Sequence, residues 1–179
     1  MKPTRSVFLL AMSLAASAAA QSTGGQPVVL PTPGGRVVSP SEQLHNTLHE
    51  EWHFAPARVE GDLVFISGIV GGARDGKAVD VAGLEAVFRR AWTAVKTTLE
   101  AAGAGTDTIV DLTTYHVFGS PLFTGTKRDH IDAFRRVKDE FVPAPYPAWT
   151  GIGVAALFPD TGLVEIKAVA RLRAAGPAK

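Results

Sequence analysis

The segment between Asp80 and Gly103 constrains the fold most, because its apolar residues recur with the period of an α-helix and form one continuous face. Asp80 is suited to cap the start of this helix, and Gly103 can adopt the left-handed conformation that ends many helices. The face needs a covering layer and consists of Leu84, Val87, Phe88, Ala91, Trp92, Val95 and Leu99. We interpret Trp92 as a core residue of this face.

A second amphipathic helix is predicted after residue 126. The residues Thr126 and Asp129 resemble a capping box in which Asp replaces the usual Glu. Prolines at 143, 145 and 147 end the pattern, because proline has no backbone N–H and clashes with the preceding turn. The residues expected to point inward are Ile131, Phe134, Val137 and Phe141.

The segments around these helices are typical of β-strands. Gly61 and Asp62 form the bend of a hairpin that leads into an apolar strand at residues 63–66, and residues 107–118 alternate with Val110, Leu112, Thr114 and His116 on one face. Residues 146–172 read as two apolar strands joined by a turn at 159–162. The order strand, strand, helix, strand, helix, strand, strand predicts an α+β fold, a mixed sheet with both helices packed on one face.

The two ends of the chain are expected to lie outside this domain. Residues 1–20 combine a basic start, a short apolar run and a final Ala-Ala-Ala, which indicates a signal peptide cleaved before Gln21 and an exported, periplasmic or secreted protein. A retained membrane anchor is the alternative. Residues 21–38 are rich in Gly and Pro and are predicted to be a flexible linker, residues 39–174 the folded domain, and residues 175–179 a loose tail.

Charge and composition exclude several classes of partner. Removal of Lys2 and Arg5 with the signal peptide leaves 16 basic residues against 17 acidic ones, and this balance argues against binding to nucleic acid. No second apolar segment approaches membrane-spanning length, so no membrane contact is expected after cleavage. The sequence has no cysteine, no glycine-rich phosphate loop and no nucleophile elbow, and no cofactor is expected.

Residues 49–53 read His-Glu-Glu-Trp-His and match the H-E-x-x-H motif of zinc proteases. In those enzymes the spacing places two imidazoles on one helical face. Here Pro56 keeps the helix short, and no downstream helix offers an obvious third ligand. A metalloprotease is therefore the remote alternative, and incidental metal binding by His45, His49 and His53 is favoured over it.

Several residues outside this motif are candidates for a ligand site. Glu165 lies inside an apolar strand, where an unpaired carboxylate is costly to bury. Trp149 and Thr150 open the preceding strand. Ser67 ends the strand at residues 63–66, where it either lines a pocket or is an ordinary strand exit. His116 lies on a half-apolar face, on which a core histidine is the commoner interpretation.

The ordered set of motifs resembles the Rid (RidA/YjgF) family of reactive-intermediate deaminases. The resemblance covers residues 52–173 in register. Its pieces are Phe-Ala-Pro-Ala at 54–57, Gly-Asp-Leu-Val-Phe-Ile-Ser-Gly at 61–68, Ala-Gly at 102–103, Asp-Leu-Thr-Thr-Tyr at 111–115, Tyr-Pro-Ala-Trp-Thr at 146–150 and Leu-Val-Glu-Ile-Lys-Ala-Val-Ala at 163–170.

This resemblance implies a chorismate-mutase-like α+β fold, a homotrimer, and small-molecule pockets between subunits. In active members an arginine after Pro-Ala grips the carboxylate of a 2-imino or 2-enamino acid, and a glutamate in the final strand helps to position the hydrolytic water. Glu165 stands at the position of that glutamate and is the candidate catalytic residue. Trp149 stands at the position of the arginine.

The replacement of arginine by Trp149 removes a permanently charged bidentate clamp and leaves one neutral donor with a flat apolar face. We therefore expect a pocket lined by Trp149, Thr150, Ser67 and His116 beside Glu165, without conventional 2-imino acid deaminase activity. Arg58 is a candidate to replace the clamp. The alternatives are a hydrolase acting on a different imine or enamine with Glu165 as acid and base, and an interface role for Trp149.

Overall fold

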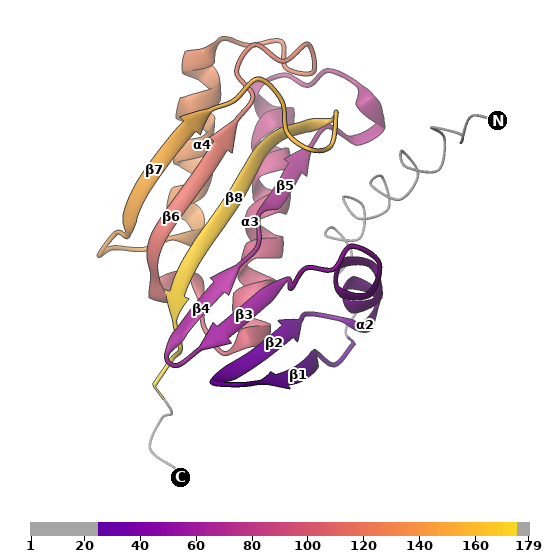
Figure 1. Ribbon diagram of the computed structural model, residues 1–179. Helices are drawn as coiled ribbons and strands as arrows, with labels where there is room; N and C mark the ends of the chain where they lie inside the picture. The colour runs from indigo at the N-terminus through magenta and orange to yellow at the C-terminus, as the bar shows by residue number, and fades with distance from the viewer. Residues whose placement is uncertain (1–24, 175–179) are drawn as a thin grey trace, which may run out of the picture.

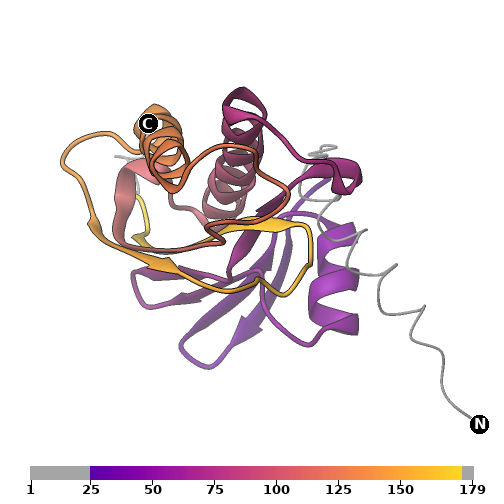
Figure 2. The same cartoon turned by 90° about the horizontal axis from the view of Figure 1, so that it is seen from above.

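The computed structural model describes residues 25–174 of the 179-residue chain. It contains one mixed β-sheet with two long helices on a single face (Figures 1 and 2). The α+β architecture expected from the sequence is therefore the architecture of the protein. No helix among the described residues is both long enough and apolar enough to cross a membrane. The predictions of a signal peptide at residues 1–20 and a loose tail at residues 175–179 fall outside the described residues.

The sheet joins strands from the whole chain. In spatial order they are β1 (Val28–Thr32), β2 (Gly35–Ser39), β3 (Ala57–Glu60), β4 (Leu63–Ile66), β8 (Gly162–Arg171), β6 (Ile109–His116) and β7 (Ala148–Gly153), and β5 (Ile69–Gly72) also pairs with β8. Strands β6 and β7 are parallel, whereas every other pairing is antiparallel. The ten-residue strand β8 lies at the centre and contacts β4, β5 and β6.

The two long helices begin and end as their capping residues predict. In α3 (Val81–Ala102) the backbone N–H of Gly83 donates to the Asp80 side chain, and Gly103 ends the helix with a φ of 91°. In α4 (Lys127–Phe141) Thr126 and Asp129 form the capping box. Both helices pack their apolar faces on the sheet, and Trp92 is fully buried in this core.

The remaining helical segments are short. They are α2 (Glu42–Leu44), the π-helix η1 (His45–Glu51), and the 3-10 turns η2 (Arg74–Gly76) and η3 (Thr106–Thr108). In the sequence Ser-Pro-Ser-Glu at 39–42, the pattern predicts Ser39 as the N-cap with Pro40 at the first helical position, and this prediction is wrong. Ser41 accepts the hydrogen bond from the N–H of Leu44, while Ser39 is the last residue of β2.

The segment predicted as a flexible linker forms a β-hairpin in the part that the structure describes. Strands β1 and β2 pair in antiparallel register around Gly34, whose φ of 82° suits the turn, and β2 continues the sheet by pairing with β3. Val28 and Leu30, which alternate along β1, are partly buried, and Val37 of β2 is buried. The composition rich in Gly and Pro thus marks a turn and an edge strand.

The expected hairpin between the last two strands is also wrong. Strands β7 and β8 do not pair with each other, because both pair with β6, which lies between them. The chain from β6 through α4 to β7 is a crossover, and such a connection joins parallel strands. The glycine-containing sequence at residues 71–80 predicts a loop, but its first two residues belong to strand β5.

Two predictions of side-chain direction are wrong, that Val110 shares the face of Leu112 and that Ile131 points inward. Val110 is 41% exposed because the register of β6 against β8 shifts between Ile109 and Asp111, which turns Val110 away from the core. Ile131 is 39% exposed, and the neighbouring His130 takes the buried position on α4. Leu112, Thr114 and His116 keep the predicted alternation and are buried.

Candidate functional site

The candidate residues are divided between the two faces of the sheet. The helix face, covered by α3 and α4, carries Leu112, Val164 and Ile166, all of which are fully buried. The open face is the opposite side, and it carries the exposed residues Phe65 and Lys167. Because side chains alternate along a strand, the pairing register assigns each candidate to one face.

Glu165 lies on the open face of β8, between Val70 of β5 and Tyr115 of β6. Its carboxylate lies over the backbone of Gly68, so closely that a Cβ at residue 68 would be 1.7 Å from Oε1. Glu165 is half-buried, and this desolvation raises the pKa of its carboxyl group above 4.5. A carboxyl group with a raised pKa is suited to exchange protons with a bound molecule.

Trp149 lies on the helix face of β7, at the edge of the sheet. Its indole Nε1–H donates to the Thr114 hydroxyl at 2.9 Å, and its ring lies 5.8 Å from the ring of Phe134 on α4. The Lys138 ammonium lies 5.7 Å above the indole ring and is paired with Asp139 at 2.5 Å. The side chain is nevertheless 41% exposed, so part of its flat face is free to contact another molecule.

Trp149 and Glu165 do not meet within one protomer. Trp149 is opposite Leu112 in β6, whereas Glu165 is opposite Tyr115. Leu112 and Tyr115 are three positions apart, an odd number, and therefore point to opposite faces. A site that contains both side chains needs a second copy of the chain.

His116 belongs to a buried chain of polar side chains behind Trp149. Its Nε2 shares a 2.9 Å hydrogen bond with the Thr114 hydroxyl, and its Nδ1 shares a 3.1 Å hydrogen bond with Nε2 of His130. Both histidines are at most 4% exposed. The pKa of each histidine is lowered to about 4, by burial in both cases and for His116 also by the neighbouring His130, so both imidazoles are neutral at pH 7.

His130 and Thr114 were not predicted as partners of a polar network. The sequence does indicate that His130 points inward, because it lies four residues before Phe134 on the apolar face of α4. The rings of Phe88, Phe118 and Phe123 also surround His130, at centroid distances between 5.1 and 5.8 Å. The network is enclosed by aromatic rings and lies in the core.

The other three candidate residues are Thr150, Arg58 and Ser67. Thr150 is opposite Thr113 on the open face. Arg58 is opposite Phe65 on the same face, and its guanidinium is paired with Glu60. The Ser67 hydroxyl donates to the carbonyl of Ala55 at 2.7 Å and thereby holds the segment before β3. The open face therefore carries Glu165, Thr150 and Arg58, and the helix face carries Trp149 and His116.

The zinc-protease geometry does not form at residues 49–53. Helix η1 ends at Glu51, and His53 lies beyond it with a φ of 56°, in the left-handed region. His49 therefore has no helical partner at residue 53. His45, His49 and Glu50 come together instead, with ligand atoms within 4.8 Å of one another.

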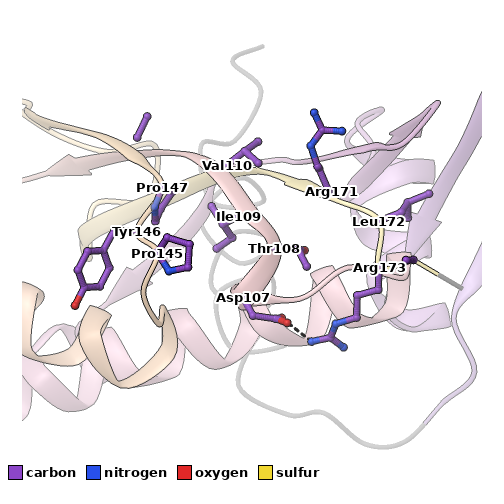
Figure 3. Close-up of a pocket in the computed structure, with 12 residues that line it drawn as sticks. Asp107, Thr108, Ile109, Val110, Pro145, Tyr146, Pro147, Arg171, Leu172 and Arg173 are labelled. Carbon is purple, nitrogen blue, oxygen red and sulfur yellow. Dashed lines mark hydrogen bonds and ion pairs between the residues drawn. The ribbon is translucent and has the colours of Figure 1, made fainter. Parts of the chain in front are cut away.

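An open groove of about 620 Å³ lies at the end of the sheet where β6 begins and β8 ends (Figure 3). One wall contains Tyr146, which is 68% exposed, and the other contains Arg171 and Arg173. Arg173 donates to Asp107 at 2.7 Å and lowers the pKa of that carboxyl group. None of the candidate residues named above lines this groove.

Comparisons with known proteins agree on one family. The family described as Endoribonuclease L-PSP matches residues 45–172. The RutC family protein YjgH of Escherichia coli (strain K12) is 33% identical over 129 residues, which are 71% of this chain and 88% of YjgH.

Solved structures give the same result. A structure of YjgH matches with a TM-score of 0.54 and 33% identity over 72% of this chain and 90% of that one. The structure of RidA from the Antarctic bacterium Psychrobacter sp. PAMC 21119 matches with a TM-score of 0.53 and 25% identity, over 66% of this chain and 88% of that one.

Proposed function

Because the chain belongs to the RidA/YjgF/L-PSP (RutC) family, we propose that it binds a small molecule in a pocket between copies of the chain and lacks conventional 2-imino acid deaminase activity. The observation that carries this proposal is the position of Trp149 and Glu165 on opposite faces of the sheet. A pocket lined by both residues combines Trp149 of one copy with Glu165 of its neighbour.

Exposed apolar surface supports the association of copies. Every residue of β7 is exposed, and among residues 25–174 this strand is an edge of the sheet with unpaired backbone groups along one side. Ile152 of β7 and Phe65 of β4 are 37% and 39% exposed on the open face. We propose a homotrimer in which these surfaces are covered.

The side chain at residue 149 determines which ligands fit. Loss of a charged partner for a carboxylate costs about 2–5 kcal/mol of binding free energy. The ammonium of Lys138 does not restore that partner, because Asp139 already neutralises it. The exposed indole face favours apolar, aromatic or cationic ligands through stacking and cation–π contacts. RNA is not proposed as a ligand, since the charge balance of the chain is near zero.

A direct assay tests the missing deaminase activity. 2-Iminopropionate is generated from alanine with an amino-acid oxidase, and its decay is followed with and without the protein. We expect no acceleration by the wild type and a measurable acceleration by Trp149→Arg. A wild-type protein that accelerates decay, and loses this activity in Glu165→Gln, contradicts the proposal.

Hydrolysis of an imine or enamine without a carboxylate is the second candidate function. The raised pKa of Glu165 favours it, because a carboxyl group that titrates nearer neutrality is a better acid and base. The same assay with a cyclic imine that lacks a carboxylate distinguishes the two functions. Acceleration that disappears in Glu165→Gln supports the hydrolase, and equal rates with and without protein exclude it for that substrate.

We also propose that the protein is exported. The proposal is supported by the basic start, the short apolar run and the Ala-Ala-Ala of residues 1–20. N-terminal sequencing of the protein expressed in a bacterium with an intact secretion system should give Gln21 as the first residue. Recovery of the chain from the cytoplasm with residues 1–20 attached contradicts export.

A further inference from the structure

The π-helix η1 brings together three residues that the proposed function does not use. A π-helix has a wider turn than an α-helix, and its N–H groups bond to the carbonyl five residues earlier. The N–H of Trp52 accordingly donates to the carbonyl of Thr47 at 3.2 Å. With this wider turn, the residues four and five positions after His45, which are His49 and Glu50, lie beside it on one side of the helix.

The potential ligand atoms of these residues converge. Oε1 of Glu50 is 2.8 Å from Nδ1 of His49 and 3.3 Å from Nε2 of His45, and the two imidazole rings are stacked with centroids 4.8 Å apart. In a tetrahedral zinc site with bonds of about 2.0–2.1 Å, neighbouring ligand atoms are about 3.3 Å apart. The two distances to Oε1 of Glu50 are near this value, and the stacked imidazole rings must rotate so that the in-plane lone pair of each points to one ion.

A buried hydroxyl orients His45. Nδ1 of His45 lies 3.3 Å from the hydroxyl of Ser39, a fully buried residue at the end of β2. When Nδ1–H donates to this hydroxyl, Nε2 keeps its lone pair and points toward Glu50. Histidine ligands in metal sites are commonly oriented by such a hydrogen bond from their second nitrogen.

We propose that His45, His49 and Glu50 form a binding site for Zn²⁺ or a similar divalent transition-metal ion. Two imidazoles and one carboxylate match the ligand preferences of zinc, whereas Mg²⁺ and Ca²⁺ prefer oxygen ligands alone. Three protein ligands leave a fourth tetrahedral position for water. The site shares His49 and Glu50 with the H-E-x-x-H match but takes its other imidazole from upstream, so that His53 has no part in it.

Zinc titration of the chelator-treated full chain tests the site. We expect one Zn²⁺ per chain by calorimetry, with the affinity reduced roughly ten-fold or more in His49→Ala and in Glu50→Gln. His53→Gln is the matched control and should bind as the wild type does. Mg²⁺ at the same concentrations should give no binding heat.

Two further measurements keep the proposal falsifiable if a ligand variant folds poorly. Zinc X-ray absorption of the wild-type protein should show two imidazoles among the nearest neighbours of the ion. Ser39→Ala leaves all three ligands in place, and it should weaken binding by about ten-fold. Binding that is lost in His53→Gln, binding unchanged in both His49→Ala and Glu50→Gln, or the absence of zinc binding to the wild type each overturns the proposal.

Discussion

Thr114 is the residue on which the buried network depends, because its single hydroxyl serves both Trp149 and His116. In Thr114→Val the indole N–H and the imidazole lose this partner, and His116 is too buried to find water. We expect the free energy of unfolding to fall by about 1–3 kcal/mol, as for other buried polar groups left unpaired. Urea denaturation at pH 7 measures this change.

The neighbouring Thr113→Val is the matched control for this experiment. Thr113 is in the same strand with the same β-branched shape, but it points to the open face and is only partly buried. Its substitution should change the free energy of unfolding by no more than about 0.5 kcal/mol. Equal losses in the two variants contradict a special role of the Thr114 hydroxyl.

Gly68 determines where the carboxylate of Glu165 lies. A Cβ at residue 68 would be 1.7 Å from Oε1, so Gly68→Ala must displace the Glu165 side chain toward solvent. We expect the pKa of Glu165 to return toward 4.5, since its desolvation is the cause of the raised value. Carboxyl ¹³C NMR during a pH titration measures this pKa.

Gly151→Ala provides the comparison for that titration. A Cβ at Gly151 meets its nearest atom, the Thr114 hydroxyl oxygen, at 3.7 Å, which is an ordinary contact. The pKa of Glu165 should therefore remain at its raised value. If Gly68→Ala leaves that pKa unchanged as well, the backbone at residue 68 does not hold the carboxylate in its half-buried position.

At the scale of elements, the contact between β6 and α4 makes stability depend on pH. His116 and His130 stay neutral in the folded protein down to a pKa of about 4, whereas in the unfolded chain they take up protons near pH 6.5. Between these values the unfolded state binds more protons, so stability falls as the pH falls. The loss is at most about 3 kcal/mol for each histidine, and the raised pKa of Glu165 offsets part of it.

Urea denaturation between pH 7 and pH 4 checks this dependence. The free energy of unfolding should be nearly constant above pH 6.5 and should decrease steadily below it. In His130→Gln one titrating group is removed and the amide can still contact His116, so the decrease should be about half as steep. A slope that is the same in the variant and the wild type shows that other groups cause the acid sensitivity.

The elements differ in how well their sequence predicts them. Helices α3 and α4 were predictable because a cap such as Asp80 and an apolar repeat act within a few residues of each other. The partner of β7 depends instead on a contact with β6 across the whole of α4. The order of strand, helix and strand was the available signal for a parallel pair, but a turn-like sequence at residues 159–162 favoured a hairpin.

The candidate site was predictable only in part, because it too depends on the pairing of strands that are far apart in the sequence. The residue types at 149 and 165 can be read from the sequence, but the face on which each side chain lies depends on the strand register. The opposite orientations of Trp149 and Glu165 follow from their pairing with Leu112 and Tyr115. The convergence of His45 with Glu50 was likewise hidden, because nothing in the local sequence distinguishes a π-helix from an α-helix there.

At the scale of the whole molecule, the proposed association of copies should depend on β7. Ile152 lies on this exposed edge strand and is itself 37% exposed on the open face beside Tyr115. Ile152→Asp places a charge in the proposed interface, where it would have to be desolvated without a partner. We expect light scattering coupled to size-exclusion chromatography to give a trimer for the wild type and a monomer for this variant.

Val29→Asp is the control that shows whether dissociation of the trimer is specific to β7 or follows the loss of any exposed apolar side chain. Val29 is 49% exposed on β1, the edge strand at the other end of the sheet from β7. Its substitution removes an apolar side chain of similar exposure without touching the Trp149 side of the molecule, so the trimer should persist.

Because a pocket shared by Trp149 and Glu165 requires two copies, the Ile152→Asp monomer should also lose ligand binding while its circular dichroism stays that of the folded chain. A monomeric wild type, or a trimer that survives Ile152→Asp and dissociates in Val29→Asp, places the contact elsewhere and removes the basis for a pocket at β7.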